Sequence, residues 1–319
     1  MTNRIVSAGV NSYVLYGKES TFNIAGTTNK RFGIDTNFSA NLTNTISGRR
    51  GMAGSTTSGR DIQKYVYGKA EYSLTIDFDV NDCSFLEFVL GNVDTTGKIY
   101  TGYATTGGVS NDVPSSITIA NCIDNTTTDR DEIYTGCVVK SATIKCAMDE
   151  PVTASLSLMA ATMAYDSSLT TNVALTDKAP FSFIGSTYEL PNSTTITNLV
   201  ESFEFTINNN PTYQYGANRT AQYVTFGARE YELKLSTKYI ADDILNKALG
   251  GTSLSGVNHP TENATLTATF SRPEGDKIKL EFKLVPISAY TLNASLNEPI
   301  GEDIDLIAKE VTITYTPSP

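Results

Sequence analysis

The residues whose chemistry could support catalysis are few and scattered in this chain. Its one histidine, His259, lies in a segment with Gly and Pro that is typical of a loop. A Ser-His-Asp or Cys-His arrangement would have to use this histidine, and no GxSxG motif provides a nucleophile. The cysteines have no CxxC spacing, so they do not predict a zinc site with a single histidine. We therefore expect no enzyme activity, no catalytic residue, no cofactor and no metal centre.

Carboxylate pairs are the remaining candidates for chemistry. Asp77 and Asp79 are two residues apart, and the segment 129–132 carries three acidic residues. Two carboxylates can act as the acid and base of a glycosidase, but such pairs are common on solvent-facing strands, and we interpret them in that way. The segment 124–132 also offers oxygen ligands for calcium, although it lacks the glycine of an EF-hand loop. A calcium site there remains a weaker alternative.

Asp77 and Asp79 belong to a segment that reads as a strand followed directly by a short helix. Apolar residues occupy every second position from Tyr72 to Val80, the pattern of a strand with one buried and one solvated face. The apolar spacing then becomes helical over 85–90, with Asn81 as the expected N-cap and Gly91 as the expected end. We expect this helix to pack on the apolar face of the strand.

The strand–helix unit occurs twice in the chain. A shift of 159 positions aligns residues 68–91 with residues 227–250 without a gap and matches glycines at both ends. The repeat predicts two tandem copies of one domain. We expect the first domain at 1–180, with an insertion at 92–135, and the second domain at 181–319.

Further alternation predicts the other strands and the fold class. The expected strands are 13–16, 38–46, 115–123, a pair within 136–166, a counterpart pair within 263–290, and a closing strand within 303–316. A long glycine-containing loop at 47–64 has its counterpart at 208–222, and loops of this length are disordered or functional. The fold class is therefore mainly β, with two tandem β-sandwich or half-barrel domains, each with one short flanking helix.

Composition narrows the class of partner. The chain has 319 residues, of which 18% are charged, and a net charge of −10. Such an acidic protein is not expected to hold nucleic acid through phosphate contacts. No apolar stretch reaches the roughly 20 residues of a membrane span, and the first residues lack the apolar core of a signal peptide. The four cysteines are too few for a disulfide scaffold, and we expect free buried thiols.

Three segments carry a resemblance to a known family. They are YVLYGKEST at 13–21, GKAEYSLTIDFDV at 68–80 running into a helix that ends in LGN, and the hairpin GCVVKSATIKCAMDEPVTASLSLMAA at 136–161. Together they resemble the tail tube proteins of long-tailed bacteriophages and related archaeal viruses. The repeat resembles the tandem-domain members of that group. The resemblance covers most of the chain as an ordered pattern, while residues 92–135 are not matched.

The resemblance implies a β-sandwich with a flanking helix, in which one sheet joins neighbouring sheets into a barrel around a lumen. Rings stack into a tube, the long loop reaches the next ring, and DNA passes through during ejection. Because duplicated domains can replace two subunits of a symmetric ring, we expect a homotrimer with pseudo-hexamer symmetry. The expected partners are the tape measure protein and DNA in the lumen, and tail terminator and tail tip proteins at the ends. The expected location is the virion tail, assembled in the host cytoplasm.

Two groups of residues are expected to serve this function. The solvated face of the repeated strand should line the lumen, with five acidic residues and two lysines, a formal charge of −3 per chain. These lumen-facing candidates are Glu71, Ser73, Thr75, Asp77, Asp79, Glu230, Glu232, Lys234, Ser236 and Lys238. The inter-ring candidates are Arg49, Arg50, Gly51 and Arg60. The alternatives are another ring-forming virion component, such as a baseplate hub, and a non-catalytic β-sandwich module that binds a surface.

Overall fold

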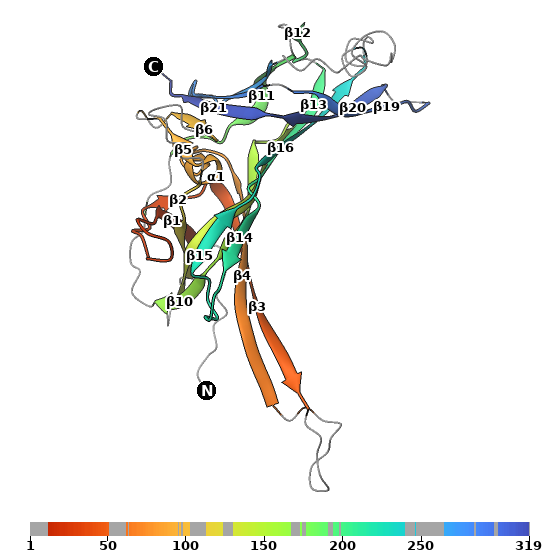
Figure 1. The fold of residues 1–319 in the computed structure, drawn as a ribbon. Coiled ribbons are helices and arrows are strands. Elements are labelled where there is room, and N and C mark those ends of the chain that lie inside the picture. Colours follow the sequence, from red (N-terminus) through yellow and green to blue (C-terminus); the bar gives the residue numbers. More distant parts are fainter. Residues whose placement is uncertain are drawn as a thin grey trace, which may run out of the picture.

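The computed structural model is mainly β (Figure 1). It describes residues 12–50, 62, 64–94, 96, 98–102, 113–123, 130–166, 173, 177–190, 194–197, 199–239, 246, 265–283, 285–296 and 299–318. The strands form two large antiparallel sheets and a small one. Both halves of the chain contribute to the main cluster of buried apolar side chains, and two smaller clusters lie apart from it, one of them containing Tyr213 of the small sheet. The expected β-sandwich class is confirmed, and the described strands form no closed barrel within the chain.

Eight strands of the largest sheet form a continuous path that crosses from one half of the chain to the other. In spatial order they are β3 (Ile34–Arg49), β4 (Lys64–Asp79), β9 (Thr153–Ala160), β8 (Arg130–Ala147), β13 (Val200–Asn208), β16 (Glu230–Lys238), β20 (Gly301–Ala308) and β19 (Ile287–Asn293). All neighbours in this path are antiparallel. The strand pair β8–β13 is the place where the two halves join.

The remaining strands cover this path. The first part of β8 also pairs with β10 (Thr162–Asp166) and with β7 (Ile117–Ile123), and β7 continues to β1 (Ser12–Lys18) and β2 (Lys30–Arg31). The 7-stranded sheet has the order β12 (Thr194–Thr195), β11 (Ser182–Leu190), β17 (Thr265–Ser271), β18 (Lys277–Lys283), β21 (Glu310–Thr316), β6 (Ile99–Thr101) and β5 (Asn92–Val93). The short hairpin β14 (Pro211–Gln214) and β15 (Tyr223–Phe226) forms its own sheet.

The helix α1 (Leu86–Leu90) follows β4 as expected, but it starts later than its expected cap. Phe85 holds the N-cap position without a side-chain hydrogen bond, and the Asn81 carbonyl instead accepts a hydrogen bond from Arg272 Nη1 at 2.9 Å. The expected end is confirmed, because Gly91 adopts a left-handed conformation with φ 99° and donates its N–H to the Glu87 carbonyl. The helix buries its apolar side chains in the core, and the rings of Phe85 and Phe78 meet edge to face at 5.1 Å.

The expected pair within 263–290 exists as the hairpin β17–β18, but it is not the counterpart of β8–β9. It lies in the 7-stranded sheet, whereas β9 and the second part of β8 lie in the eight-strand path. Within the eight-strand path, the second half instead contributes β19 and β20, along with β13 and β16. The expected closing strand within 303–316 is divided between β20 and β21. Alternation identifies these strands, but it does not say which sheet a hairpin joins.

The two expected long loops have different structures. In the first half, β3 extends to Arg49 and β4 begins at Lys64, so the two ends of the expected loop at 47–64 belong to a two-stranded arm that projects from the body (Figure 1). In the second half, the hairpin β14–β15 packs back on the first half, where Tyr213 donates hydrogen bonds to the carbonyls of Gly136 and Met159. Residues 51–61 lie outside the described residues.

Several expectations fall wholly or partly outside the described residues. They concern His259, the calcium alternative at 124–129, and the second helix, of which Asn246 alone is described, in a helical conformation. Where side chains are described, the four cysteines are free and buried as expected. No helix in the described part of the chain is long and apolar enough to cross a membrane.

Candidate functional site

The lumen-facing candidates lie on one solvated face of the eight-strand path. In β4 the side chains of Ser73, Thr75 and Asp77 are exposed, while those between them are buried in the core. In β16 the side chains of Glu230, Glu232 and Lys234 are exposed in the same way. Glu71, Asp79, Ser236 and Lys238 are half-buried at the ends of these rows. The alternation therefore has the phase that the sequence predicts.

The register extends this surface across all eight strands. We call it the polar face, and it consists of Asn37, Ser39, Asn41 and Thr43 of β3, Glu71, Ser73, Thr75, Asp77 and Asp79 of β4, Thr153, Ser155, Ser157 and Met159 of β9, Ser141, Thr143 and Lys145 of β8, Ser202, Glu204, Thr206 and Asn208 of β13, Glu230, Glu232, Lys234, Ser236 and Lys238 of β16, Gly301, Asp303, Asp305 and Ile307 of β20, and Ala289, Thr291 and Asn293 of β19. Its carboxylates outnumber its lysines.

The lumen-facing candidates on β4 are not adjacent to those on β16. The strands β4 and β16 share the polar face, but β9, β8 and β13 separate them. The polar face also carries charged side chains that were not among the candidates, namely Glu204, Asp303, Asp305 and Lys145. The alternation of acidic and apolar residues in Asp303–Leu306 was a usable signal for two of these.

Few of the carboxylates on the polar face are neutralised by lysine. Lys234 Nζ lies 3.8 Å from Glu204 and Lys69 Nζ lies 2.6 Å from Glu71, and both pairs are accessible to solvent. Lys238 Nζ lies 3.3 Å from Glu201, which is outside the polar face. Asp303 instead accepts hydrogen bonds from Ser236 Oγ at 2.7 Å and from Asn293 Nδ2 at 2.6 Å. Exposed pairs of this kind contribute little to stability. Because the carboxylates of the polar face outnumber its lysines, the surface keeps its acidic character.

Asp79 is the carboxylate at the end of β4. Partial burial and the nearby charge of Asp35 raise the pKa of Asp79 above its usual value. Burial disfavours the ionised form, and a second carboxylate disfavours it further. Asp79 therefore takes up a proton more readily than an isolated aspartate does.

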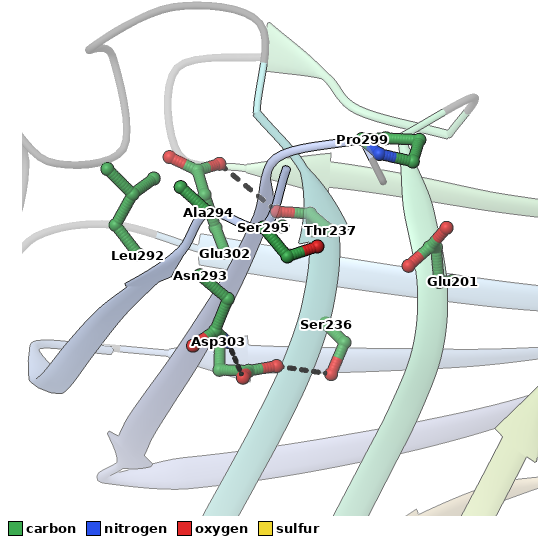
Figure 2. Close-up of a pocket in the computed structure, with 11 residues that line it drawn as sticks. Glu201, Ser236, Thr237, Leu292, Asn293, Ala294, Ser295, Pro299, Glu302 and Asp303 are labelled. Atoms are coloured by element: carbon green, nitrogen blue, oxygen red, sulfur yellow. Dashed lines mark hydrogen bonds between the residues drawn. The ribbon is translucent and has the colours of Figure 1, made fainter. Parts of the chain in front are cut away.

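A cavity lies where the polar face reaches β19 (Figure 2). It has a volume of about 640 Å³ and is lined mainly by the ends of β13, β16, β19 and β20. Glu302 is buried beside it and accepts hydrogen bonds from Thr237 Oγ1 at 3.2 Å and Tyr290 Oη at 2.6 Å. Leu292 and Asn293 of the edge strand β19 also line it. These groups do not form a nucleophile–base arrangement, and the cavity follows the edge of the sheet.

Two of the inter-ring candidates lie toward the far end of the arm. Arg49 and Arg50 are exposed there, and Gly51 and Arg60 are outside the described residues. The arm also exposes apolar side chains, namely Ile46, Ile62, Tyr65, Val66 and Tyr67. Such side chains on a projecting hairpin are suited to contact with another molecule.

The arm is supported at its base by the hairpin β14–β15. From the turn of that hairpin, Arg219 donates to the Gly68 carbonyl at 3.1 Å and to Asn44 Oδ1 at 3.0 Å. Its guanidinium group also lies 5.5 Å from the centre of the Tyr67 ring. The two long connections of the chain therefore contact each other.

The fold and these surfaces define a class of protein, a β-sandwich protein with a continuous polar sheet face, a projecting arm and exposed sheet edges. The family model for the phage tail tube protein matches residues 9–317, and the chain belongs to this family. This confirms the resemblance that the sequence motifs indicate. No curated protein was found to match the chain. Family membership means a structural subunit that assembles with other copies into the tube of a virus tail.

Proposed function

We propose that three copies of this chain form each ring of the tail tube, and that the polar face lines the lumen through which DNA leaves. The observation that carries the proposal is the eight-strand path, which already joins two four-stranded units edge to edge within one chain. Each chain would then occupy two of six similar positions around the ring.

The proposal includes a duplication of one domain, at 1–180 and 181–319. Its support is the strand order, since β3-β4-β9-β8 in the first half corresponds to β13-β16-β20-β19 in the second. Tyr72 of β4 stands opposite Ala160, and Tyr231 of β16 stands opposite Ala308. Both hairpins also carry an irregularity at the same place, after Val139 in β8 and after Ile287 in β19.

The polar face explains how a tube can guide DNA without retaining it. Carboxylates such as Asp77, Glu232 and Asp305 repel phosphates, while the Debye length of about 8 Å at physiological salt limits the repulsion to DNA near the wall. The lysines on this face are fewer and partly paired, so they offer few phosphate contacts. The same wall would enclose the tape measure protein before ejection.

The arm is the proposed contact between stacked rings. Arg49 and Arg50 at its end would meet acidic groups of the next ring, together with Gly51 and Arg60 of the same connection. Tail terminator and tail tip proteins would cap the two ends of the tube, which is assembled in the host cytoplasm. Deletion of residues 51–59 should leave a folded protein that no longer forms tubes.

Electron microscopy of the purified protein tests the proposal directly. We expect stacked rings in which three chains present six similar units. A ring with six chains would overturn the stoichiometry, and closed rings that never stack would favour the baseplate hub alternative. Monomers at high concentration that bind a surface receptor would favour the surface-binding module.

A further inference from the structure

The two ends of the eight-strand path are edge strands with exposed apolar side chains. Among the described strands, β3 pairs with β4 alone and β19 pairs with β20 alone. Leu42 of β3 is 46% exposed and Leu292 of β19 is 50% exposed. Long exposed edges favour pairing with another chain.

The junction β8–β13 within the chain shows how such edges can pair. In this junction Ala142 stands opposite Ile207, Ile144 opposite Phe205, and Lys145 opposite Glu204. The side chain of Ile144 is 6% exposed and that of Ile207 is fully buried. Edge pairing at this junction therefore completes the core on one side and the polar face on the other.

The edge strands have the same local register as the two strands of this junction. Ile144 of β8 stands opposite Ala154 of β9, and Leu292 of β19 stands opposite Glu302 of β20, with an irregularity four positions earlier in both strands. The strand β19 therefore has the geometry of β8, with Leu292 in the place of Ile144.

The strands β3 and β13 also correspond to each other, because each pairs with a strand of the repeated unit. Phe38 stands opposite Ile76 of β4, and Phe203 stands opposite Leu235 of β16. Ile76 and Leu235 are related by the repeat, so Phe38 takes the place of Phe203. Counting along the two strands from Phe38 and Phe203, Ala40 corresponds to Phe205 and Leu42 corresponds to Ile207.

We propose that β19 of one chain pairs with β3 of a second copy of this chain in the register of β8–β13. Leu292 then stands opposite Ala40 of the neighbour, Asn293 opposite Ser39, and Thr291 opposite Asn41. This inference rests on the proposed ring, and it adds which edges meet and in which register. The exposed Leu42 and Leu292 become buried in this contact, as Ile207 and Ile144 are within the chain.

A side-chain clamp accompanies the internal junction and has a counterpart at the edge. Just after β13, Asn209 donates from its backbone N–H to the Lys140 carbonyl at 2.9 Å. Its Nδ2 donates to the Val139 carbonyl at 3.3 Å and to the Val89 carbonyl at 2.9 Å. Its Oδ1 accepts a hydrogen bond from Arg229 Nε at 2.8 Å. On β3 the corresponding residue is Asn44, whose Oδ1 accepts a hydrogen bond from Arg219. Asn44 therefore donates to the carbonyls of Ile287 and Ser288 in the neighbour.

The turn after β19 supports the same placement. Within the chain, Met148 after β8 donates its N–H to the Glu201 carbonyl at the start of β13. In the correspondence between β8 and β19, the counterpart of Met148 is Leu296, which is 98% exposed. In the proposed contact Leu296 lies against Thr36 of the neighbour. The incoming β3 then passes along the cavity of Figure 2 on the side that Leu292 and Asn293 line.

Disulfide trapping in assembled tubes tests the register. The double variant Ser39→Cys with Asn293→Cys places two cysteines directly opposite each other. Their Cα atoms are then about 4.5–5.5 Å apart, within the range of about 4.4–6.8 Å that a disulfide spans. The matched controls are Ser39→Cys with Thr291→Cys and Ser39→Cys with Ser295→Cys, which are each displaced by two residues. The native cysteines are buried and add little background. We expect linked dimers and trimers, ending at the trimer, for the first variant alone.

The possible outcomes distinguish an error in the proposed register from an error in the proposed ring. Rings that link through a control pair overturn the register while leaving the ring intact. Tubes in which none of the three pairs links overturn the pairing of these two edges. Failure of the unmodified protein to form rings or tubes overturns the proposed function.

The variant Asn44→Ala gives a second test that does not depend on disulfides. Loss of one hydrogen-bonding side chain should weaken ring formation about fivefold. The thermal unfolding of the monomer should change little, because Asn44 is exposed. Asn37→Ala is the matched control and should assemble normally. Equal ring formation by the two variants would contradict the proposed hydrogen bonds from Asn44 to the neighbouring chain.

Discussion

Asp276 is a buried carboxylate that contacts two cationic side chains, Arg272 and Lys178. It is fully buried, forms an ion pair with Arg272, and accepts hydrogen bonds from Lys178 Nζ at 2.7 Å and from Tyr315 Oη at 3.1 Å. Arg272 also donates to the Asn81 carbonyl, which connects the second half of the chain to the start of the helix region in the first. One buried charge pair therefore holds the two halves in a fixed arrangement.

Replacement of Asp276 by Asn should destabilise the protein strongly at neutral pH. The change leaves the buried Arg272 without its counter-charge, and removal of one partner of a buried pair typically costs about 3–5 kcal/mol. Chemical unfolding monitored by circular dichroism measures the effect. Lys279→Ala breaks an exposed pair with Glu281 and is the control, with an expected loss below about 1 kcal/mol. Similar losses in the two variants would contradict a structural role for the buried pair.

The same variant also has an expected pH dependence. Burial alone would raise the pKa of Asp276, but the hydrogen bonds from Lys178, Ser318 and Arg272 together lower it. A lowered folded-state pKa contributes stability above the unfolded value of about 3.9, and this stability is lost as the pH falls below that value. The unfolding free energies of the wild type and Asp276→Asn should therefore begin to converge below about pH 4, and the difference should keep shrinking as the pH falls further. A difference that stays constant over this range would show that the ionised form is not responsible.

At the scale of elements, the helix α1 depends on how it ends. Gly91 adopts φ 99°, a conformation that costs an L-residue with a Cβ about 1–2 kcal/mol. Gly91→Ala should lower the unfolding free energy by about that amount. Gly91→Asn should cost less, because Asn enters the left-handed region more readily. Equal stabilities of the wild type and Gly91→Ala in denaturant titrations would contradict this account.

Local pattern predicted the elements better than it predicted their partners. The strand β4, the end of α1 at Gly91, and the strands β7, β8 and β9 follow from alternation and from a glycine that ends a helix. The sequence did not indicate that β19 and β20, rather than β17 and β18, contribute to the eight-strand path. Which sheet a hairpin joins depends on contacts between distant segments, and a single sequence does not encode these as a local period.

The arm can be tested through its exposed apolar residues. Tyr65 and Val66 are 57% and 49% exposed, so replacement of both by Ser should change the unfolding free energy by no more than about 0.5 kcal/mol. The same change should shorten or abolish tubes, because the arm would lose apolar contact with the next ring. Ile184→Ser in β11 is the control, at 72% exposure away from the arm. Tubes of normal length from the Tyr65 and Val66 variant would remove these residues from the stacking contact.

At the scale of the whole molecule, the polar face is built by register and could be only partly foreseen. The sequence indicates the two acidic rows on β4 and β16, since each alternates on its own. It does not indicate that β9, β8 and β13 connect them into one surface, or that Glu204 and Asp305 face Lys234 from either side. The candidates therefore belong to a polar face that extends across both halves of the chain.

The charge of this wall gives a prediction about DNA passage. Asp77 is exposed on the polar face, and its neighbours along the strand, Ile76 and Phe78, are buried in the core. Asp77→Lys should therefore leave ring assembly unchanged while it places a cation in the lumen at every chain. Phosphates attracted to this ring of lysines should slow DNA ejection.

The effect should grow as salt is lowered, because the Debye length increases from about 8 Å at physiological ionic strength to about 30 Å at 0.01 M. Glu189→Lys makes the same charge change on the exposed side of β11 in the 7-stranded sheet, and it is the matched control. Ejection kinetics of virions with each variant tube, at the two ionic strengths, measure the difference. If both variants eject DNA at the wild-type rate at low salt, then either the polar face does not line the lumen or its charge has no part in passage.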